Sequence, residues 1–417
     1  MTKKSDAPAI RFKGFSDAWE QRKLGDISEI KTGPFGSTLH ADDYVSDGTP
    51  IITTEHFKTG ALPRSKNGLP QVSDSDYKRL TAYTLDDGDI VFSRVGSVDI
   101  NALITPFQSN WLFSGRVLRV RPQTDISSKF LHTRLETESI KTDIRTRAVG
   151  QTMPSINTEI LKITPLVLPS SAAEQEQIGS YFAALDNLIT LHQRKFEKLT
   201  NVKKSMLEKM FPQNGSSYPE IRFKGFTDPW EQRKLSEITD KVTEKNAGLQ
   251  YVETFTNSAE FGIISQRDFF DHDIAKLGSL DGYYIVKTED FVYNPRISTS
   301  APVGPINRNK LGRTGVMSPL YTVFRPHDID TTYLEYFFKC GYWHSFMNFN
   351  GDSGARSDRF SIRDNVFFQM PIPIPDIDEQ RKIGELLTCL DNLITLHQRE
   401  LEKLQNIKKS MLEKMFV

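Results

Sequence analysis

The chain contains the stretch LDNLITLHQRKFEKLTNVKKSMLEKMF at residues 185–211 and repeats it as LDNLITLHQRELEKLQNIKKSMLEKMF at residues 390–416. Four of the twenty-seven positions differ. A shorter stretch, IRFKGFSDAWEQRKL at residues 10–24, returns with two differences in fifteen as IRFKGFTDPWEQRKL at residues 221–235. The segments between these repeats share almost nothing at that level. Two copies of one framework therefore carry two different inserts.

The long repeat has the pattern of an amphipathic helix. Ser171 with Glu174, and Asp376 with Glu379, stand where capping boxes would start the two helices. Glu174–Phe211 as one helix would be about 57 Å long, and Pro212 would end it. Apolar residues at steps of three and four form one narrow stripe, which is typical of a coiled-coil seam. The predicted seam consists of Leu185, Ile189, His192, Phe196, Leu199, Val202 and Met206, and of Leu390, Ile394, His397, Leu401, Leu404, Ile407 and Met411.

A helix with an apolar stripe needs a partner, and the nearest candidate is its own copy. A tandem repeat closed by an approximate two-fold axis would pair the two helices antiparallel. The alternative is that each helix packs only on its own half of the chain. His192 and His397 lie on the stripe, where a core histidine that sets the register is a better interpretation than a catalytic one.

The short repeat also carries helix-start signals. Asp17 with Glu20, and Asp228 with Glu231, have capping-box spacing, and Pro229 would take the first helical position. Trp19 and Trp230 are then predicted to anchor the core. Each short helix is expected to introduce one variable region.

The two variable regions are predicted to share one architecture. Strands are expected at residues 50–54, 88–95 and 117–121 in the first, and at 290–297 and 320–325 in the second. Helical periodicity covers residues 130–146 and 332–348. The fold class is therefore α+β, with two mixed domains in tandem, each followed by a long helix, and the helices forming an antiparallel coiled coil with pseudo-two-fold symmetry.

The composition excludes several classes of protein. Charged residues make up 25% and hydrophobic residues 38% of the 417 residues, and the net charge is zero. These values are ordinary for a globular protein, and no apolar run is long enough to span a membrane. The N-terminus has no apolar signal core, so a cytoplasmic location is expected. Cys340 and Cys389 stand far apart, which argues against a disulfide framework or a cysteine zinc site.

Motifs for catalysis are missing. The chain has no GxxxxGK[ST] nucleotide loop, no HExxH metal spacing and no complete motif of an amino-group methyltransferase. Its variable loops are instead rich in Gly, Ser, Thr, Asn and Arg. Arginine can bind guanine through two hydrogen bonds, whereas Asn and Gln suit adenine. We expect a protein that recognises a partner and leaves chemistry to other subunits.

The repeats closely resemble the specificity subunit of type I restriction-modification systems. The matching features are the LDNLITLHQR…KSMLEKMF helices, the RFKGFxDxWEQRKL segments and their alternation with two variable regions. The resemblance covers essentially the whole chain beyond the first nine residues. The resemblance implies that each variable region reads one half of a split site in double-stranded DNA, with the paired helices setting the spacing. It also implies two methylation subunits, which bind S-adenosylmethionine, and two restriction subunits, which use ATP and Mg²⁺. No cofactor or metal is expected in this chain, which would be non-catalytic, and no membrane partner is expected.

The resemblance places recognition in the variable loops. In the first region the expected DNA-contacting residues are Ser37, His40, Arg94, Ser97, Gln151 and Thr152. In the second region they are Arg296, Ser298, Thr299, Arg308, Arg313, Arg356 and Arg359.

The repeats also predict the boundaries of six segments. These are a constant segment at 1–24, a target recognition domain at 25–170, a helix at 171–211, a linker with the second constant segment at 212–235, a second recognition domain at 236–375 and a helix at 376–417.

One alternative function is a coiled-coil adaptor that holds two protein-binding modules and does not bind DNA. Another is an enzyme whose active site lies unrecognised in a variable region.

Overall fold

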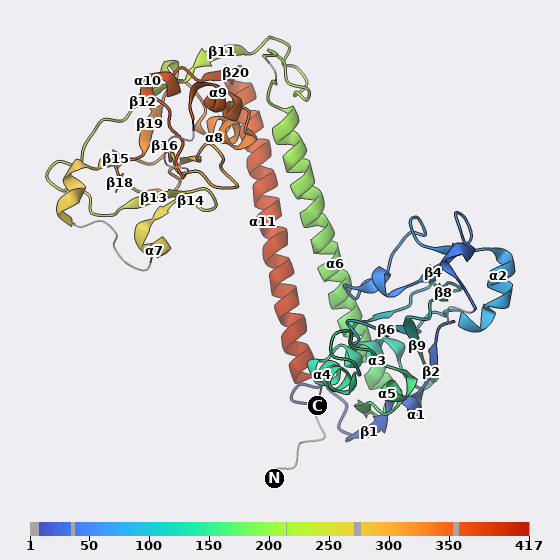
Figure 1. Ribbon diagram of the computed structural model, residues 1–417. Coiled ribbons are helices and arrows are strands. Elements are labelled where there is room, and N and C mark those ends of the chain that lie inside the picture. The colour runs from blue at the N-terminus through green and yellow to red at the C-terminus, as the bar shows by residue number, and fades with distance from the viewer. Residues whose placement is uncertain (1–7, 35–37, 214, 271–276, 353–357, 417) are drawn as a thin grey trace. The chain divides into compact units, whose positions relative to one another are not determined.

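The computed structural model describes residues 8–34, 38–213, 215–270, 277–352 and 358–416. The chain divides into two compact units. Unit 1 comprises residues 1–193 and 399–417, and unit 2 comprises residues 194–398. Both boundaries fall inside a long helix, so each unit holds parts of both (Figure 1).

Both units contain helices and strands. The α-helices are α1 (Leu24–Ile27), α2 (Asp74–Arg79), α3 (Ser128–Leu135), α4 (Glu138–Arg147), α5 (Thr158–Lys162), α6 (Ala172–Lys209), α7 (Gln266–Phe270), α8 (Thr331–Cys340), α9 (Trp343–Asn350), α10 (Asp364–Phe367) and α11 (Ile377–Lys414). The strands of unit 1 are β1 (Trp19–Lys23), β2 (Ser28–Thr32), β3 (Tyr44–Val45), β4 (Thr49–Ile52), β5 (Gln71–Val72), β6 (Ile90–Ser93), β7 (Asn101–Leu103), β8 (Leu112–Phe113), β9 (Val117–Pro122) and β10 (Pro165–Pro169). The strands of unit 2 are β11 (Glu231–Lys234), β12 (Thr239–Lys241), β13 (Phe255–Ser258), β14 (Gly262–Ser265), β15 (Tyr284–Val286), β16 (Phe291–Tyr293), β17 (Ile306–Arg308), β18 (Gly315–Met317), β19 (Thr322–Pro326) and β20 (Pro371–Ile374).

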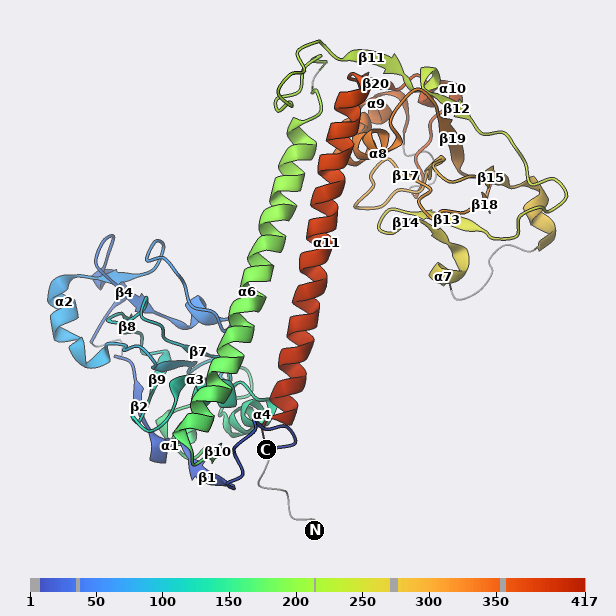
Figure 2. The ribbon, with the colours of Figure 1, turned by 180° about the vertical axis from the view of Figure 1, so that it is seen from behind.

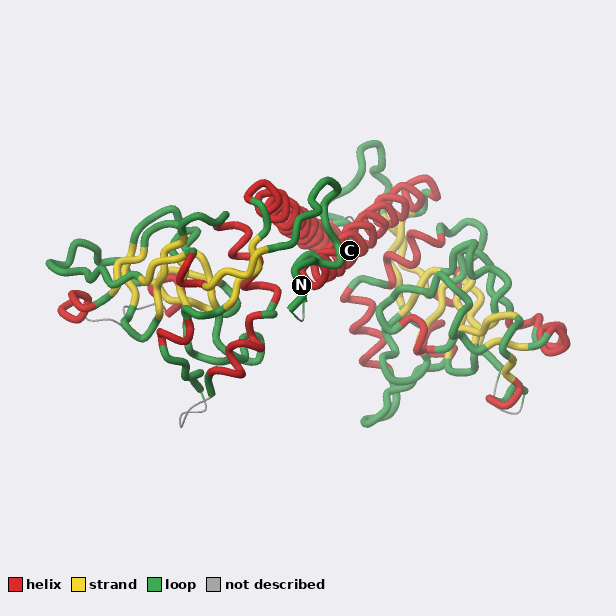
Figure 3. Tube along the Cα trace, turned by 90° about the horizontal axis from the view of Figure 1, so that it is seen from above, coloured by secondary structure: helices red, strands yellow, loops and turns green. Residues whose placement is uncertain are grey.

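Each unit is built on the same four-stranded sheet. Its strand order is β2-β9-β6-β7 in unit 1 and β12-β19-β16-β17 in unit 2, with all pairs antiparallel. A two-stranded sheet accompanies it in each unit, β1-β10 and β11-β20. In Figure 3 the strands of each unit form one cluster bordered by helices and loops. The predicted α+β class, with a long helix after each mixed domain, is confirmed.

Matching ion pairs fix the register of the two sheets. Arg121 donates Nε and Nη2 to the buried Asp89 at 2.7 Å each, and Arg325 does the same to the buried Asp290 at 2.7 and 2.9 Å. The hydrogen bonds to Asp89 and Asp290 raise the pKa of each arginine. Asp89 and Asp290 therefore occupy equivalent positions, although their surrounding sequences differ.

The remaining strands distinguish the units. Unit 1 adds a sheet of order β3-β5-β4-β8, whereas unit 2 adds the hairpin β13-β14 and the pair β15-β18. These additions pack separate small cores, one around Phe57 and Phe113 and another around Phe255 and Met317. The divergence of the two inserts is thus concentrated in peripheral sheets, while the central sheet is shared.

The long helices pair antiparallel within each unit (Figures 1 and 2). In unit 1, Phe182 meets Phe416 at 5.9 Å between ring centroids, and Asp186 meets Lys408 at 2.6 Å. Along these contacts the residue number rises in α6 while it falls in the partner segment, as an antiparallel arrangement requires. In unit 2, Asp391 forms the equivalent ion pair with Lys203 at 2.5 Å.

The short repeat ties the end of one long helix to the start of the other. In unit 1, Ile10 N–H donates to the Lys414 carbonyl at 3.0 Å, and Arg11 donates to both oxygens of Glu174 at 2.6 and 2.7 Å. The corresponding contacts in unit 2 join Ile221 to the Lys209 carbonyl at 2.9 Å and Arg222 to Glu379 at 2.7 and 2.8 Å. Both glutamates are fully buried, so the arginines supply their charge balance.

This tie corrects the role predicted for the two glutamates. Ser171 Oγ does accept the N–H of Glu174 at 3.4 Å, and Asp376 caps through the N–H of Asp378 at 2.8 Å. The Glu174 and Glu379 carboxylates, however, accept from the short repeat instead of completing capping boxes. The distant arginine supplies two charge-assisted hydrogen bonds, which outweigh a local backbone contact.

The helices predicted in the short repeat are wrong. Residues 19–23 form strand β1, which pairs with β10, and residues 231–234 form β11, which pairs with β20. Strand pairing with a segment more than 130 residues away overrides the local helix-start signal. The predicted core role of the tryptophans is confirmed, because Trp19 and Trp230 are 4% and 3% exposed.

The two predicted internal helices are each split in two. Residues 128–147 form α3 and α4 with a break at Glu136, and residues 331–350 form α8 and α9 with a break at Gly341. Gly341 has φ +77°, which glycine adopts without strain. All five predicted strands are present, although their ends differ by a few residues.

Replacing Arg11 or Arg222 with alanine should destabilise the protein by roughly 3–5 kcal/mol, because each change leaves a buried carboxylate without its partner. The measurement is urea unfolding of the wild type and each variant. Lys13→Ala and Lys224→Ala, at exposed positions of the same repeats, are the matched controls and should change stability little. An unfolding midpoint for Arg11→Ala equal to that of Lys13→Ala would contradict the assignment.

Candidate nucleic-acid interface

Two of the predicted recognition loops of unit 1 are hydrogen-bonded to each other. The loop after β6 and the hairpin after α4 meet through Gly96 N–H to the Pro154 carbonyl, at 2.8 Å, and Ile156 N–H to the Arg94 carbonyl, at 2.9 Å. The hairpin itself closes through paired hydrogen bonds between Val149 and Ser155, at 2.9 and 2.8 Å. The backbone thus brings Arg94 and Ser97 next to the tip that carries Gln151 and Thr152.

A pocket of about 470 Å³ lies at this end of the sheet in unit 1. Its lining includes Arg94, the exposed Arg116 and Tyr44. The Arg94 guanidinium donates to the Gly115 carbonyl at 3.1 Å, which holds it at the pocket wall. His40 is exposed and follows Leu39, another lining residue. Of the predicted contact residues of unit 1, Arg94 therefore lines this pocket together with a second arginine, Arg116, and His40 adjoins a lining residue.

Unit 2 repeats this arrangement with different residues. Ile297 N–H donates to the Asp358 carbonyl at 3.0 Å, and Phe360 N–H donates to the Pro295 carbonyl at 2.7 Å. These bonds place Arg296 directly across from Arg359. Ser298 and Thr299 continue the same loop and are exposed.

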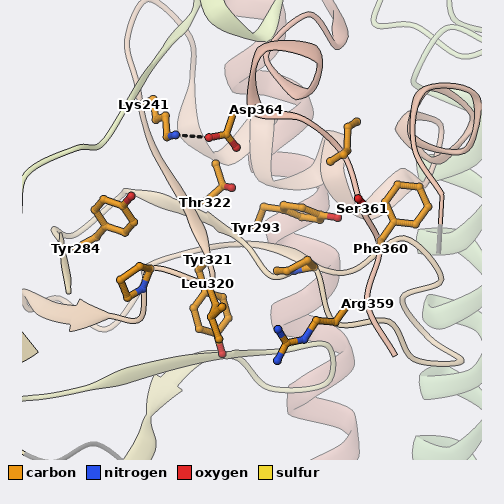
Figure 4. A pocket seen from close by; sticks show the side chains of 13 residues that line it. Lys241, Tyr284, Tyr293, Leu320, Tyr321, Thr322, Arg359, Phe360, Ser361 and Asp364 are labelled. Carbon is orange, nitrogen blue, oxygen red and sulfur yellow. Dashed lines mark hydrogen bonds and ion pairs between the residues drawn. The ribbon is translucent and has the colours of Figure 1, made fainter. Parts of the chain in front are cut away.

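The pocket at this end of the sheet in unit 2 has a volume of about 480 Å³ and is shown in Figure 4. Arg359 lies on the same side as Tyr321 and Leu320, and the ion pair of Lys241 with Asp364 lies at the opposite side. Aromatic side chains form much of the wall, in contrast to unit 1.

Two predicted contact residues have other partners. Arg308 is held inside unit 2 by Glu335 at 2.6 Å and Glu289 at 3.1 Å, and its side chain is only 9% exposed. We therefore assign Arg308 to the core of unit 2 and drop it from the candidate interface. Arg313 is exposed and donates to both oxygens of Glu253 at 2.8 and 2.7 Å, which raises the pKa of Arg313 and lowers that of Glu253.

Ser37 and Arg356 lie outside the described residues. Six lining residues come from turns and strand ends that carry no recognition motif, namely Tyr44, Arg116, Lys241, Tyr284, Leu320 and Tyr321. Arg116 and Tyr321 immediately precede β9 and β19, so a search of predicted strand ends would have found them.

Some of the predicted seam residues pack against the core of the unit in which they lie, and others are half-buried along the helices. Leu404, Ile407 and Met411 pack against the core of unit 1, which contains Leu185. Leu199, Val202 and Met206 pack against the core of unit 2, which contains Leu390. Ile189, His192, Phe196, Ile394, His397 and Leu401 are half-buried.

Metal-binding clusters and membrane-spanning helices are both absent from the described ranges. No group of three or more His, Cys, Asp or Glu side chains there is placed to hold a metal ion. No helix in the same part of the chain is long and apolar enough to cross a membrane.

Comparison with known proteins points to one family. The family model described as type I restriction modification DNA specificity domain matches residues 16–201 and again residues 227–406. The chain is 25% identical to the type I restriction enzyme MjaX specificity subunit of Methanocaldococcus jannaschii, with 94% of this chain and 92% of that protein aligned. It is 22% identical to the MjaVIII specificity subunit of the same organism, over 94% of this chain and 91% of that protein.

A solved structure shares the fold. The crystal structure of the type I restriction-modification system S subunit from M. genitalium aligns with a TM-score of 0.59 and 14% sequence identity, covering 99% of both chains.

Arg308→Leu should destabilise unit 2 by roughly 3 kcal/mol, because Glu335 would remain buried with less compensating charge. Arg313→Leu is the matched control, since its ion pair is exposed to solvent and such pairs contribute about 1 kcal/mol or less. Thermal unfolding of the two variants compares them directly. Equal transition temperatures would show that Arg308 is not a core residue.

Proposed function

Since this chain belongs to the family of type I restriction modification DNA specificity domains, we propose that it is the subunit that selects the DNA target of such a complex. Each unit reads one half of a bipartite site in double-stranded DNA. The supporting observation is that the two units share a central sheet and place different side chains at the same end of it. The chain itself is non-catalytic.

The candidate interface supports recognition through both base edges and phosphates. In unit 1 the contacts come from His40, Arg94, Ser97, Gln151 and Thr152. In unit 2 they come from Arg296, Ser298, Thr299, Arg313 and Arg359. Arginine and glutamine suit guanine and adenine edges, and serine or threonine can bind either an edge or a phosphate. Ser37 and Arg356 belong to the same proposed loops.

The paired helices set the spacing between the half-sites and bind two methylation subunits. Leu188 and Leu191 of unit 1 are 43% and 46% exposed, and their copies Leu393 and Leu396 of unit 2 are 37% and 51% exposed. Neighbouring exposed leucines, repeated in both copies, are typical of a surface that another protein covers. Two identical surfaces suit two copies of one partner.

The chemistry resides in the partner subunits. The methylation subunits bind S-adenosylmethionine and methylate adenine, and two restriction subunits use ATP and Mg²⁺. The complex works in the cytoplasm, where the genomic DNA lies.

The proposal is tested by mapping methylated bases in genomic DNA from cells that express this chain with its methylation subunit. Cells that lack only this chain are the control. We expect one new split motif with methylated adenines on both strands. No new motif, with the complex demonstrably assembled, would favour the coiled-coil adaptor that never meets DNA. Methylation by this chain alone would favour an enzyme with an unrecognised active site.

Arg94→Ala should relax or abolish recognition of the first half-site and leave the second unchanged. Loss of one arginine contact to a base costs about 1–3 kcal/mol, or roughly a five- to 150-fold weaker preference. The measurement is competitive DNA binding by the assembled complex with single-base changes in each half-site. Arg22→Ala, in the repeated strand β1, is the control and should leave both half-sites intact. Altered preference in the second half-site would contradict the separation of roles.

Glutamates in place of Leu188 and Leu191 should remove one of the two methylation subunits, because a carboxylate is costly to bury in an apolar contact. The same change at Leu393 and Leu396 should also leave a single methylation subunit bound. Native mass spectrometry measures the number bound to each variant. Asn201→Glu, at an exposed position of α6, is the control. Two bound subunits in both leucine variants would refute this docking surface.

A further inference from the structure

The pockets of unit 1 and unit 2 occupy equivalent positions on the shared sheet. The Asp89–Arg121 and Asp290–Arg325 pairs align β6 with β16 and β9 with β19. The cross-strand hydrogen bonds to the carbonyls of Arg94 and Pro295 confirm this alignment beyond the strand ends. Differences between the pockets are therefore substitutions at matching places in one framework.

The turn before β9 or β19 carries the clearest difference. Arg116 of unit 1 stands five residues before Arg121, and Leu320 of unit 2 stands five residues before Arg325. Both residues are exposed, Leu320 to 61%. The next position is a fully buried valine in unit 1 and the half-buried Tyr321, which faces the pocket, in unit 2. The cationic wall of unit 1 is thus replaced by an aromatic and apolar wall.

The aromatic side chains of unit 2 are held in fixed positions. The Tyr321 hydroxyl lies 3.3 Å from Thr256 Oγ1. Lys245 Nζ lies 3.3 Å from the centroid of the Tyr284 ring. Tyr293, another lining residue, donates its hydroxyl to the Val303 carbonyl at 2.9 Å and is 3% exposed. Tyr284 and Tyr321 remain half-buried, so parts of them are open to the pocket.

Polar groups border this wall. Arg359 lies beside Tyr321 and Leu320 (Figure 4). The exposed Ser361 and the half-buried Thr322 also line the pocket. A flat aromatic ligand with hydrogen-bonding edges suits this combination. It would stack on a tyrosine and meet the guanidinium or a hydroxyl at its edge. Nucleobases have this chemistry, and proteins bind unstacked bases in this way.

We propose that the aromatic pocket of unit 2 takes up one nucleobase that leaves the base stack of the DNA half-site read by this unit. The inference rests on the proposed function. Leu320, exposed at the rim, enters the gap that the departing base leaves between its neighbours, as apolar side chains do in kinked DNA. Unit 1, with Arg94 and Arg116 at its pocket, keeps its half-site stacked and binds edges and phosphates.

The test uses the complex of the full chain with its methylation subunits and duplexes that carry the mapped target. Mismatches are placed one at a time at each base pair of the second half-site. Weakening a pair lowers the cost of unstacking its base, so affinity should rise about tenfold at one position. The pair that holds the methylated adenine is omitted, because that adenine must leave the stack for methylation.

Two variants at Tyr321 connect the gain in affinity to the pocket. Tyr321→Leu should lose the gain and bind the matched duplex roughly five- to 150-fold more weakly, as loss of one stacked base predicts. Tyr321→Phe keeps the ring and should keep both affinities close to those of the wild type. Tyr44→Leu in unit 1 is the matched control and should leave the mismatch profile of the second half-site unchanged.

Three outcomes overturn the inference. One is that no mismatch outside the methylated pair raises affinity. Another is that the gain persists undiminished in Tyr321→Leu. The third is that Tyr321→Phe is as defective as Tyr321→Leu. All three presuppose that the complex methylates a split target, whereas failure of the proposed function would appear earlier, as the absence of any such target.

Discussion

One buried ion pair holds each unit together, at the same place in both. The short repeat is joined to the start of a long helix by Arg11 with Glu174 in unit 1 and by Arg222 with Glu379 in unit 2. Both glutamate side chains are buried. A buried charge destabilises a protein unless it is paired, so loss of the arginine of the short repeat would destabilise the start of the long helix. The strand that follows the arginine then pairs with the strand that precedes the helix. These contacts between distant parts of the chain are the same in both units and account for the close similarity of the two short repeats.

The same framework makes divergence possible elsewhere. The glutamine that follows each of these glutamates makes the same two kinds of hydrogen bond in both units. Gln175 accepts the N–H of Ser127 and donates to the Pro169 carbonyl, at 3.0 and 2.9 Å, and Gln380 does so with Asp330 and Pro375, at 2.9 Å each. With helix, strand and sheet fixed by these contacts, the turns at the far end of the sheet can change without loss of the fold. Arginines at one pocket and tyrosines at the other are consistent with this freedom.

Much of this arrangement could be predicted from the sequence, because the long repeats show the helical periodicity and the two-fold organisation directly. The long helices, their antiparallel pairing, the core tryptophans and the shared strands followed from periodicity and repetition. The short helices were wrongly predicted, since Trp19–Lys23 has helix-start signals but gains more from pairing with β10. The capping role of Glu174 was wrong for a similar reason, because its partner Arg11 is 163 residues away.

The candidate interface was harder to predict. Loops rich in Arg and Ser pointed to Arg94, Arg296 and Arg359, and backbone hydrogen bonds bring these loops together with their neighbours. Arg308 looked the same in sequence, but Glu335 on α8 holds it in the interior. Tyr284 and Tyr321 carried no motif, because an aromatic pocket arises only when separate turns meet.

In the proposed function the two units are interchangeable domains that read DNA independently. The most direct measurement exchanges residues 25–170 for the equivalent segment of a family member with a different mapped target, and then maps methylated adenines in the genome. The account predicts a new motif in which one half-site has changed and the other half-site is retained with the same spacing. A change in both half-sites would contradict it.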